Sequence, residues 1–290
     1  MAADPALRAL AARVAARYLA GETLDEAVAR VRRINADGHA ATVDFMGEST
    51  RDEALAEAAT TEFLRLVQAI RAAGLRCSVS LDLSHLGSVI DRGLGLANAR
   101  RVAEATGEAG IELLISMEGH DRVEQVLGDH GALAAEHDHV GVTVQARLHR
   151  TGADLAGLLD RPGHGRIRLV KGAYDTPVEL AHERDTDALD RAFDAHAGLL
   201  LGSGHPCSIA THDEGRLAAA ERVVDTGGLR GGPYLFEVLD GLGPAQIRGL
   251  RGRGHPTQVY VVYGTEWWLY VCNRLAEEPE RVWQAVIDAV

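Results

Sequence analysis

Eight short segments with the apolar, β-branched composition of strands recur along the chain, and alanine-, glutamate- and arginine-rich segments with helical periodicity separate most of them. Strands that alternate with helices in this way are typical of parallel sheets with crossover helices. Because the alternation repeats eight times, it predicts a closed (β/α)8 TIM barrel of the α/β class rather than an open, doubly wound sheet. The expected strands are 40–46, 77–83, 112–117, 140–146, 167–172, 207–211, 235–239 and 258–263.

The length and charge of the chain narrow its class further. Its 290 residues suit a single barrel domain, 1–290, and its formal net charge of -12 disfavours nucleic acid as a partner. No run of about 18 apolar residues and no signal-type core is present, so we expect no integral membrane segment. The three widely spaced cysteines suggest neither a disulfide framework nor a zinc site. We therefore expect a cytoplasmic protein.

Short helices are expected before the first strand, over about 4–37. Asp4 and Pro5 have the residue types of an N-cap and a first helical position, and an apolar stripe follows them. Thr23 and Glu26 have the spacing of a capping box before a second helix, which Gly38 would end. The arginines of these helices leave open a peripheral contact with a membrane surface.

The run 166–174 places several charges in and after the fifth expected strand. Strict alternation would separate the side chains of Arg168 and Lys171, so they can share a ligand only if the chain leaves the strand near Val170. The carboxyl ends of barrel strands form the catalytic face of such folds. No G-x-G-x-x-G or Walker pattern opens a helix, which disfavours a nucleotide-binding Rossmann fold or a nucleotide hydrolase.

An aromatic-rich helix is expected after the last strand. Tyr270, Asn273, Arg274 and Glu277 fall at helical spacing on one face of it. A helix that only packed on the barrel wall would carry apolar residues there. We therefore expect this face to turn toward a substrate.

Four segments of the sequence resemble motifs of the proline dehydrogenase family of flavoenzymes, and the resemblance extends over about residues 21–281. They are 168–174, 210–213, 239–241 and the segment from Tyr260 through Glu277, and Glu48 and Gln145 also match. The resemblance implies a distorted barrel that binds FAD at the strand carboxyl ends and carries its last helix over the mouth. It also implies an FAD-dependent oxidoreductase acting on CH–NH groups.

The resemblance also assigns roles to individual residues. It implies that Arg168 and Gln145 contact the flavin ring, and that Arg168 and Tyr260, with Tyr270 and Arg274 of the last helix, form the catalytic set. The other implied cofactor-binding residues are Lys171, Gly172, Ala173, Thr211 and His212. The implied substrate-binding residues are Asp82, Ser116, Tyr174, Leu239, Asn273 and Glu277.

Three positions depart from the family pattern at the substrate site. Asp82 stands where the family has a lysine, Ser116 where it has an aspartate, and Asn273 where it has an arginine. Because a carboxylate substrate needs cationic partners, we expect an amine other than plain proline, a modified cyclic or N-substituted one in specialised metabolism. Hydride transfer from the carbon next to nitrogen to flavin would then give an imine.

Alternatives remain open at this point. The chain could be an authentic L-proline dehydrogenase of proline catabolism, a Schiff-base lyase that uses Lys171, or a non-catalytic family member. The electron acceptor could be a quinone, oxygen or a protein. None of the 13 histidines pairs with a helical neighbour at metal-ligand spacing near carboxylates, so we expect no metal.

Overall fold

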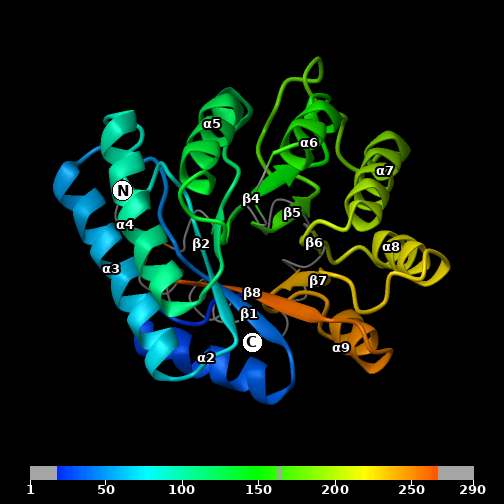
Figure 1. Cartoon of the computed structure of the whole chain (residues 1–290), viewed down its shortest axis with the longest axis horizontal. Helices are drawn as coiled ribbons and strands as arrows, with labels where there is room; N and C mark the ends of the chain where they lie inside the picture. The colour runs from blue at the N-terminus through cyan, green and yellow to red at the C-terminus, as the bar shows by residue number, and fades with distance from the viewer. Residues whose placement is uncertain (1–17, 162, 164, 267–290) are drawn as a thin grey trace, which may run out of the picture.

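The structure is a computed structural model that describes residues 18–161, 163 and 165–266. Within this part of the chain, eight parallel strands close into a barrel in the order β1 to β8, as predicted. Helices surround the barrel (Figure 1). The strands are β1 Ala40–Phe45, β2 Cys77–Leu81, β3 Leu113–Ile115, β4 Val140–Gln145, β5 Ile167–Val170, β6 Cys207–Ala210, β7 Tyr234–Leu239 and β8 Thr257–Tyr263.

The first of the described helices precedes β1, and the others connect successive strands on the outside of the barrel. They are α2 Leu24–Ala36, α3 Glu53–Ala72, α4 Arg92–Ala109, α5 Val123–Ala134, α6 Thr151–Leu159, α7 Asp187–Ser203, α8 Glu214–Thr226 and α9 Pro244–Gly252, with a 3-10 turn, η1, at His120–Arg122. The expected capping box of α2 is confirmed, since Thr23 and Glu26 each bond the backbone of the other. The helix expected from Asp4 and the last helix both lie outside the described residues.

The apolar core lies between the strands and the helices. Phe63 of α3, Phe193 of α7 and Phe236 of β7 are fully buried there. Burial of outward-facing strand residues against amphipathic helices is the main source of stability in such a fold.

The inside of the barrel is polar, which sets this chain apart from barrels filled by branched apolar side chains. Strand β8 contributes Gln258, which hydrogen-bonds Thr42 and Ser78. Thr42 and Ser78 also bond each other at 2.8 Å. Polar groups buried at this depth are stable only when they are paired, so the interior is a hydrogen-bonded network.

Six strands end earlier than the sequence predicted, β2, β3 and β5 by two residues and β1, β4 and β6 by one. Strand β2 ends at Leu81, before Asp82, and β5 ends at Val170, before Lys171. The chain therefore leaves the strand at Val170, which is the condition for Arg168 and Lys171 to approach one ligand. Gly172 follows with φ of 109°, a left-handed conformation that favours glycine.

Candidate functional site

A buried arginine occupies the centre of the barrel interior. The Arg168 side chain is 3% exposed, and its Nε donates to Glu237 Oε2 at 3.0 Å. Its two terminal nitrogens donate to Ser80 Oγ at 3.1 Å and Thr42 Oγ1 at 3.2 Å. Burial acts to lower the pKa of Arg168, but Glu237, Tyr260 and Asp44 together outweigh it and the pKa is raised. The barrel thus holds a permanent cation in a fixed orientation.

Tyr260 links this cation to a carboxylate on the neighbouring strand. The Arg168 guanidinium carbon lies 4.9 Å from the centre of the Tyr260 ring, in cation–π geometry. The Tyr260 hydroxyl donates to Asp44 Oδ2 at 2.5 Å. Burial raises the pKa of Asp44 to about 7, although the bond from Tyr260 and the charge of Arg168 oppose the rise.

Carboxylates gather at the mouth of the barrel beyond β1, β2 and β3. Burial, followed by the charges of Asp44 and Glu118, raises the pKa of Asp82 well above its ordinary value. Ser116 donates a hydrogen bond to Asp82 and thereby opposes the rise. Glu118 is buried and pairs with Arg122 at 2.7 Å. This side of the mouth is therefore acidic.

Tyr174 is close enough to this acidic side to respond to it. Burial, and then the charges of Asp82 and Glu48, raise the pKa of Tyr174, so the phenol stays protonated. Arg147 holds the loop in place, because it donates to the backbone oxygens of Tyr174 at 2.7 Å and His182 at 3.0 Å. The loop after β5 thus places a neutral aromatic beside the carboxylates.

The opposite side of the mouth is organised around Lys171. Its Nζ lies 2.6 Å from Asp213 Oδ2 and 3.2 Å from Asp190 Oδ1. Burial acts to lower the pKa of Lys171, but these two carboxylates outweigh it and raise the pKa. Thr211 accepts a hydrogen bond from the Asp213 backbone, and His212 lies between the two. The rim of β5 and β6 therefore presents a charged amine held by anions.

The backbone of Gly172 lies close to the side chain of Gln145, next to Lys171. A Cβ on Gly172 would lie 2.8 Å from Gln145 Oε1. Gln145 is buried, and its amide donates to the Glu118 backbone oxygen at 2.7 Å. Any side chain at Gly172 would collide with the Gln145 amide, so glycine is what allows the loop after β5 to lie this close to the end of β4.

The structure brings several of the expected site residues to one end of the barrel. Arg168, Tyr260, Asp82 and Ser116 belong to one group of contacts in and above the interior, and Leu239 is the register partner of Tyr260. The rim residues Lys171, Gly172, Ala173, Thr211 and His212 follow β5 and β6, and Ala173 contributes its backbone oxygen to Arg184. Four expected residues lie outside the described part of the chain: Tyr270, Asn273, Arg274 and Glu277.

Sequence reasoning missed Asp44 and did not assign a role to Glu237. A signal was available for Asp44, because a carboxylate inside an otherwise apolar strand needs a partner. The partner, Tyr260, is 216 positions away, so the sequence alone could not identify it.

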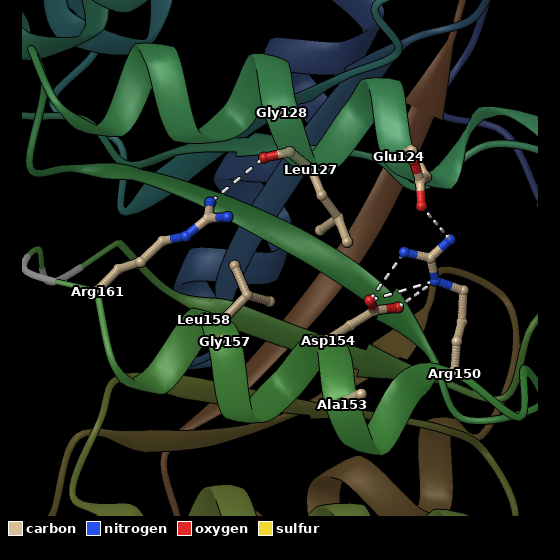
Figure 2. Close-up of a pocket in the computed structure, with 9 residues that line it drawn as sticks. All are labelled: Glu124, Leu127, Gly128, Arg150, Ala153, Asp154, Gly157, Leu158 and Arg161. Carbon is tan, nitrogen blue, oxygen red and sulfur yellow. Dashed lines mark hydrogen bonds and ion pairs between the residues drawn. The ribbon is translucent and has the colours of Figure 1, made fainter.

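A surface groove between α5 and α6 is separate from this site (Figure 2). Arg150 pairs with Asp154 of its own helix at 2.9 Å and reaches across the groove to Glu124 at 3.5 Å, while Arg161 donates to the Leu127 backbone oxygen. These are ordinary surface contacts within α6 and between α6 and α5. Among residues 18–266 that are described, no cluster of histidine, cysteine or carboxylate side chains could hold a metal ion, and no helix is long and apolar enough to span a membrane.

The family model and the relatives that match this chain carry the same description. The family model described as proline dehydrogenase matches residues 27–278. Proline dehydrogenase 1 of Bacillus subtilis (strain 168) is 31% identical over 265 residues, which cover 91% of this chain and 87% of the relative. Proline dehydrogenase of Deinococcus radiodurans is 33% identical over 272 residues, which cover 92% and 86%.

A solved structure has the same fold. Proline utilization A from Bdellovibrio bacteriovorus, inactivated by N-propargylglycine, superposes with a TM-score of 0.85 at 20% identity. The match covers 90% of this chain and 32% of the other, so the present chain spans about a third of that longer protein. At this identity the likeness concerns the fold alone.

Proposed function

The chain belongs to the proline dehydrogenase family and is an FAD-dependent oxidoreductase acting on CH–NH groups, and we propose that its substrate is L-proline. The reaction removes a hydride from the ring carbon next to nitrogen and gives a cyclic imine. The names of the relatives support proline over the modified amine expected from the sequence. The whole chain, 1–290, then acts as one barrel domain.

The residues at the mouth fit FAD. Lys171 offers a charged amine of the kind that binds phosphate oxygens, and the absence of a side chain at Gly172 lets the loop after β5 lie directly against the Gln145 amide. When bound, FAD supplies the hydride acceptor, and the protein contributes orientation and electrostatics. Lys171, Gln145, Thr211 and His212 would hold the cofactor.

The observation that carries the proposal is the fixed guanidinium of Arg168. A flavin that accepts hydride gains negative charge, and a cation that is already oriented stabilises that charge without further reorganisation. Glu237, Ser80 and Thr42 hold Arg168 in place before any ligand arrives. Tyr260 and Tyr174 would confine the substrate ring, which brings its C–H bond into reacting distance.

The environment of Lys171 argues against a Schiff-base lyase. A lysine that attacks a carbonyl must be neutral, and enzymes achieve this by lowering its pKa. The carboxylates of Asp213 and Asp190 raise the pKa of Lys171 and keep it charged. These contacts suit a residue that binds anions.

A second candidate substrate follows from the acidic side of the mouth. Asp82 bonds Ser116 and faces Asp44 and Glu118, so the described residues offer a carboxylate group of the substrate little positive charge there. A cyclic secondary amine without a free carboxylate would suit that surface.

The proposal is tested by reconstituting the purified protein with FAD and measuring reduction of an artificial dye acceptor by L-proline. We expect dye reduction and a product whose mass corresponds to loss of a hydride and a proton. A parallel assay with pyrrolidine, which lacks the carboxylate, separates the two candidates. Dye reduction by pyrrolidine alone would replace proline with the carboxylate-free amine, and protein that cannot take up FAD would refute both.

A further inference from the structure

The hydrogen bond between Tyr260 and Asp44 joins two inward-facing groups of the barrel that the oxidation of an amine could use. The donor–acceptor distance is 2.5 Å, at the short end for a hydroxyl and a carboxylate. Both side chains are only partly buried, so this pair lies between the closed interior and the open mouth. Such a contact is more than a core requires, because an apolar pair would pack as well at lower cost.

We propose that Tyr260 and Asp44 form a proton relay that removes the proton from the substrate ammonium before hydride transfer, with Tyr260 at the substrate and Asp44 as the final acceptor. This inference rests on the proposed oxidation of a secondary amine at the same site. Under this assignment Tyr260 is a catalytic residue, and Asp44 is a positioning and proton-accepting residue that acts through it.

The chemistry requires such an acceptor. A protonated amine has no lone pair on nitrogen, and that lone pair drives the loss of hydride from the neighbouring carbon. In the proposed step the ammonium N–H bond breaks and the proton goes to the Tyr260 oxygen, while the Tyr260 proton goes to Asp44. The freed lone pair then forms the C=N bond as hydride leaves to the bound FAD. The proton returns from Asp44 to solvent after the product departs.

Tyr260 is suited to pass a proton without holding a charge. A phenol that donates its one proton keeps two lone pairs for accepting another. Burial, and then the charge of Asp44, raise the pKa of Tyr260 well above its ordinary value. A stable phenolate is therefore disfavoured, and the negative charge stays on Asp44.

Asp44 suits the role of final acceptor better than Asp82 does. A general base is most effective when its pKa is close to the working pH, and burial raises the pKa of Asp44 to about 7. Asp82 has a pKa raised well above the ordinary value, and within residues 18–266 that are described its side-chain hydrogen bond goes to Ser116 rather than to Tyr260. The titratable and charged groups that interact electrostatically with Asp44 are Arg168, Asp82, Tyr174 and Tyr260 inside the barrel, and Tyr263 from its outer side.

The test uses Asp44→Asn and Tyr260→Phe in the FAD-loaded protein. Asparagine still accepts the bond from Tyr260 but cannot take its proton, and phenylalanine keeps the ring under Arg168. In wild type, kcat/KM for L-proline should rise with pH through a limb near pH 7. Each variant should lose this limb and about 10²- to 10⁴-fold in kcat. The double variant should be no slower than the single ones, because residues that act as a unit are not additive.

Tyr263→Phe is the matched control on the same strand. Its hydroxyl donates to Glu62 at 3.2 Å on the outer side of the barrel. The substitution also removes a buried phenol oxygen, so a structural effect of that kind would appear here too. The control should keep the pH limb and the wild-type rate within a few fold.

A second readout does not depend on turnover. Infrared difference spectra of the cofactor-free protein should show a protonated carboxyl band that disappears with a midpoint near pH 7 and is missing in Asp44→Asn. A midpoint below pH about 5, near the ordinary value, would overturn the relay, as would multiplicative losses in the double variant. Variants that keep the pH limb would refute it while leaving the proposed oxidation intact. A loaded wild-type protein that oxidises no amine would refute both.

Discussion

Arg168 and Glu237 form an ion pair inside the barrel, with Nε 3.0 Å from Oε2 and side chains 3% and 2% exposed. Ser208 also donates to the paired oxygen of Glu237. Since neither charge reaches solvent, each depends on the other for its stabilisation. The cation assigned to the flavin is thus held by a partner that sequence reasoning left without a role.

Glu237→Leu should destabilise the fold, because it leaves the Arg168 guanidinium buried without a counter-charge. We expect a loss of about 3 to 5 kcal/mol in the free energy of unfolding, measured by urea denaturation. Asp225→Asn is the control, since its pair with Arg230 is 45% and 48% exposed, and it should cost at most about 1 kcal/mol. Equal urea midpoints for the two variants would show that the buried pair stabilises the fold no more than the exposed pair does.

Gly172→Ala should impair FAD binding and stability together. The residue has φ of 109°, and its new Cβ would lie 2.8 Å from Gln145 Oε1. We expect a destabilisation of about 1 to 3 kcal/mol and weaker flavin uptake on titration with FAD. Gly198→Ala is the control: it lies in α7 with nothing within 4 Å of the added Cβ. It should bind FAD normally and gain about 0.5 to 1 kcal/mol. Normal FAD uptake by Gly172→Ala would refute the role of this close approach.

Lys171 can be followed directly, because it is the only lysine in the chain. Reductive methylation with labelled formaldehyde should modify this side chain and the terminal amine alone. FAD should slow the reaction at Lys171, and Asp213→Asn should accelerate it by removing the carboxylate 2.6 Å from Nζ. The label can be read by NMR, and the terminal amine serves as the internal control. Labelling of Lys171 at the same rate with and without FAD would contradict its assignment to the cofactor.

Asp82→Asn should change how stability depends on pH. Because the folded pKa of Asp82 is raised, the native state binds more protons than the unfolded state above the ordinary aspartate range. Wild-type stability therefore falls as pH rises from about 4, by up to about 1.4 kcal/mol per pH unit from this group. The variant should lose that part of the decline, as seen in urea midpoints at several pH values. A decline as steep in Asp82→Asn as in wild type would show that Asp82 is not the group responsible.

The sequence predicted the barrel well, because the spacing of apolar residues along the chain differs clearly between buried parallel strands and amphipathic helices. It set the ends of β2, β3 and β5 two residues too late, since Leu83, Met117 and Gly172 continue an apolar pattern after each ladder has ended. The rim residues followed from the family resemblance, and the structure places them at one end of the barrel. Asp44 could not be found in this way, because its role depends on the β1–β8 register that closes the barrel.

The central claim is that this chain oxidises L-proline with FAD, and an anaerobic titration of the reconstituted protein tests it most directly. Without an acceptor, the substrate's hydride must remain on the flavin. We predict that L-proline bleaches the absorption bands of the oxidised flavin and that D-proline, which presents the carboxylate on the other face, bleaches them far less. A flavin that stays oxidised in excess L-proline would contradict the claim.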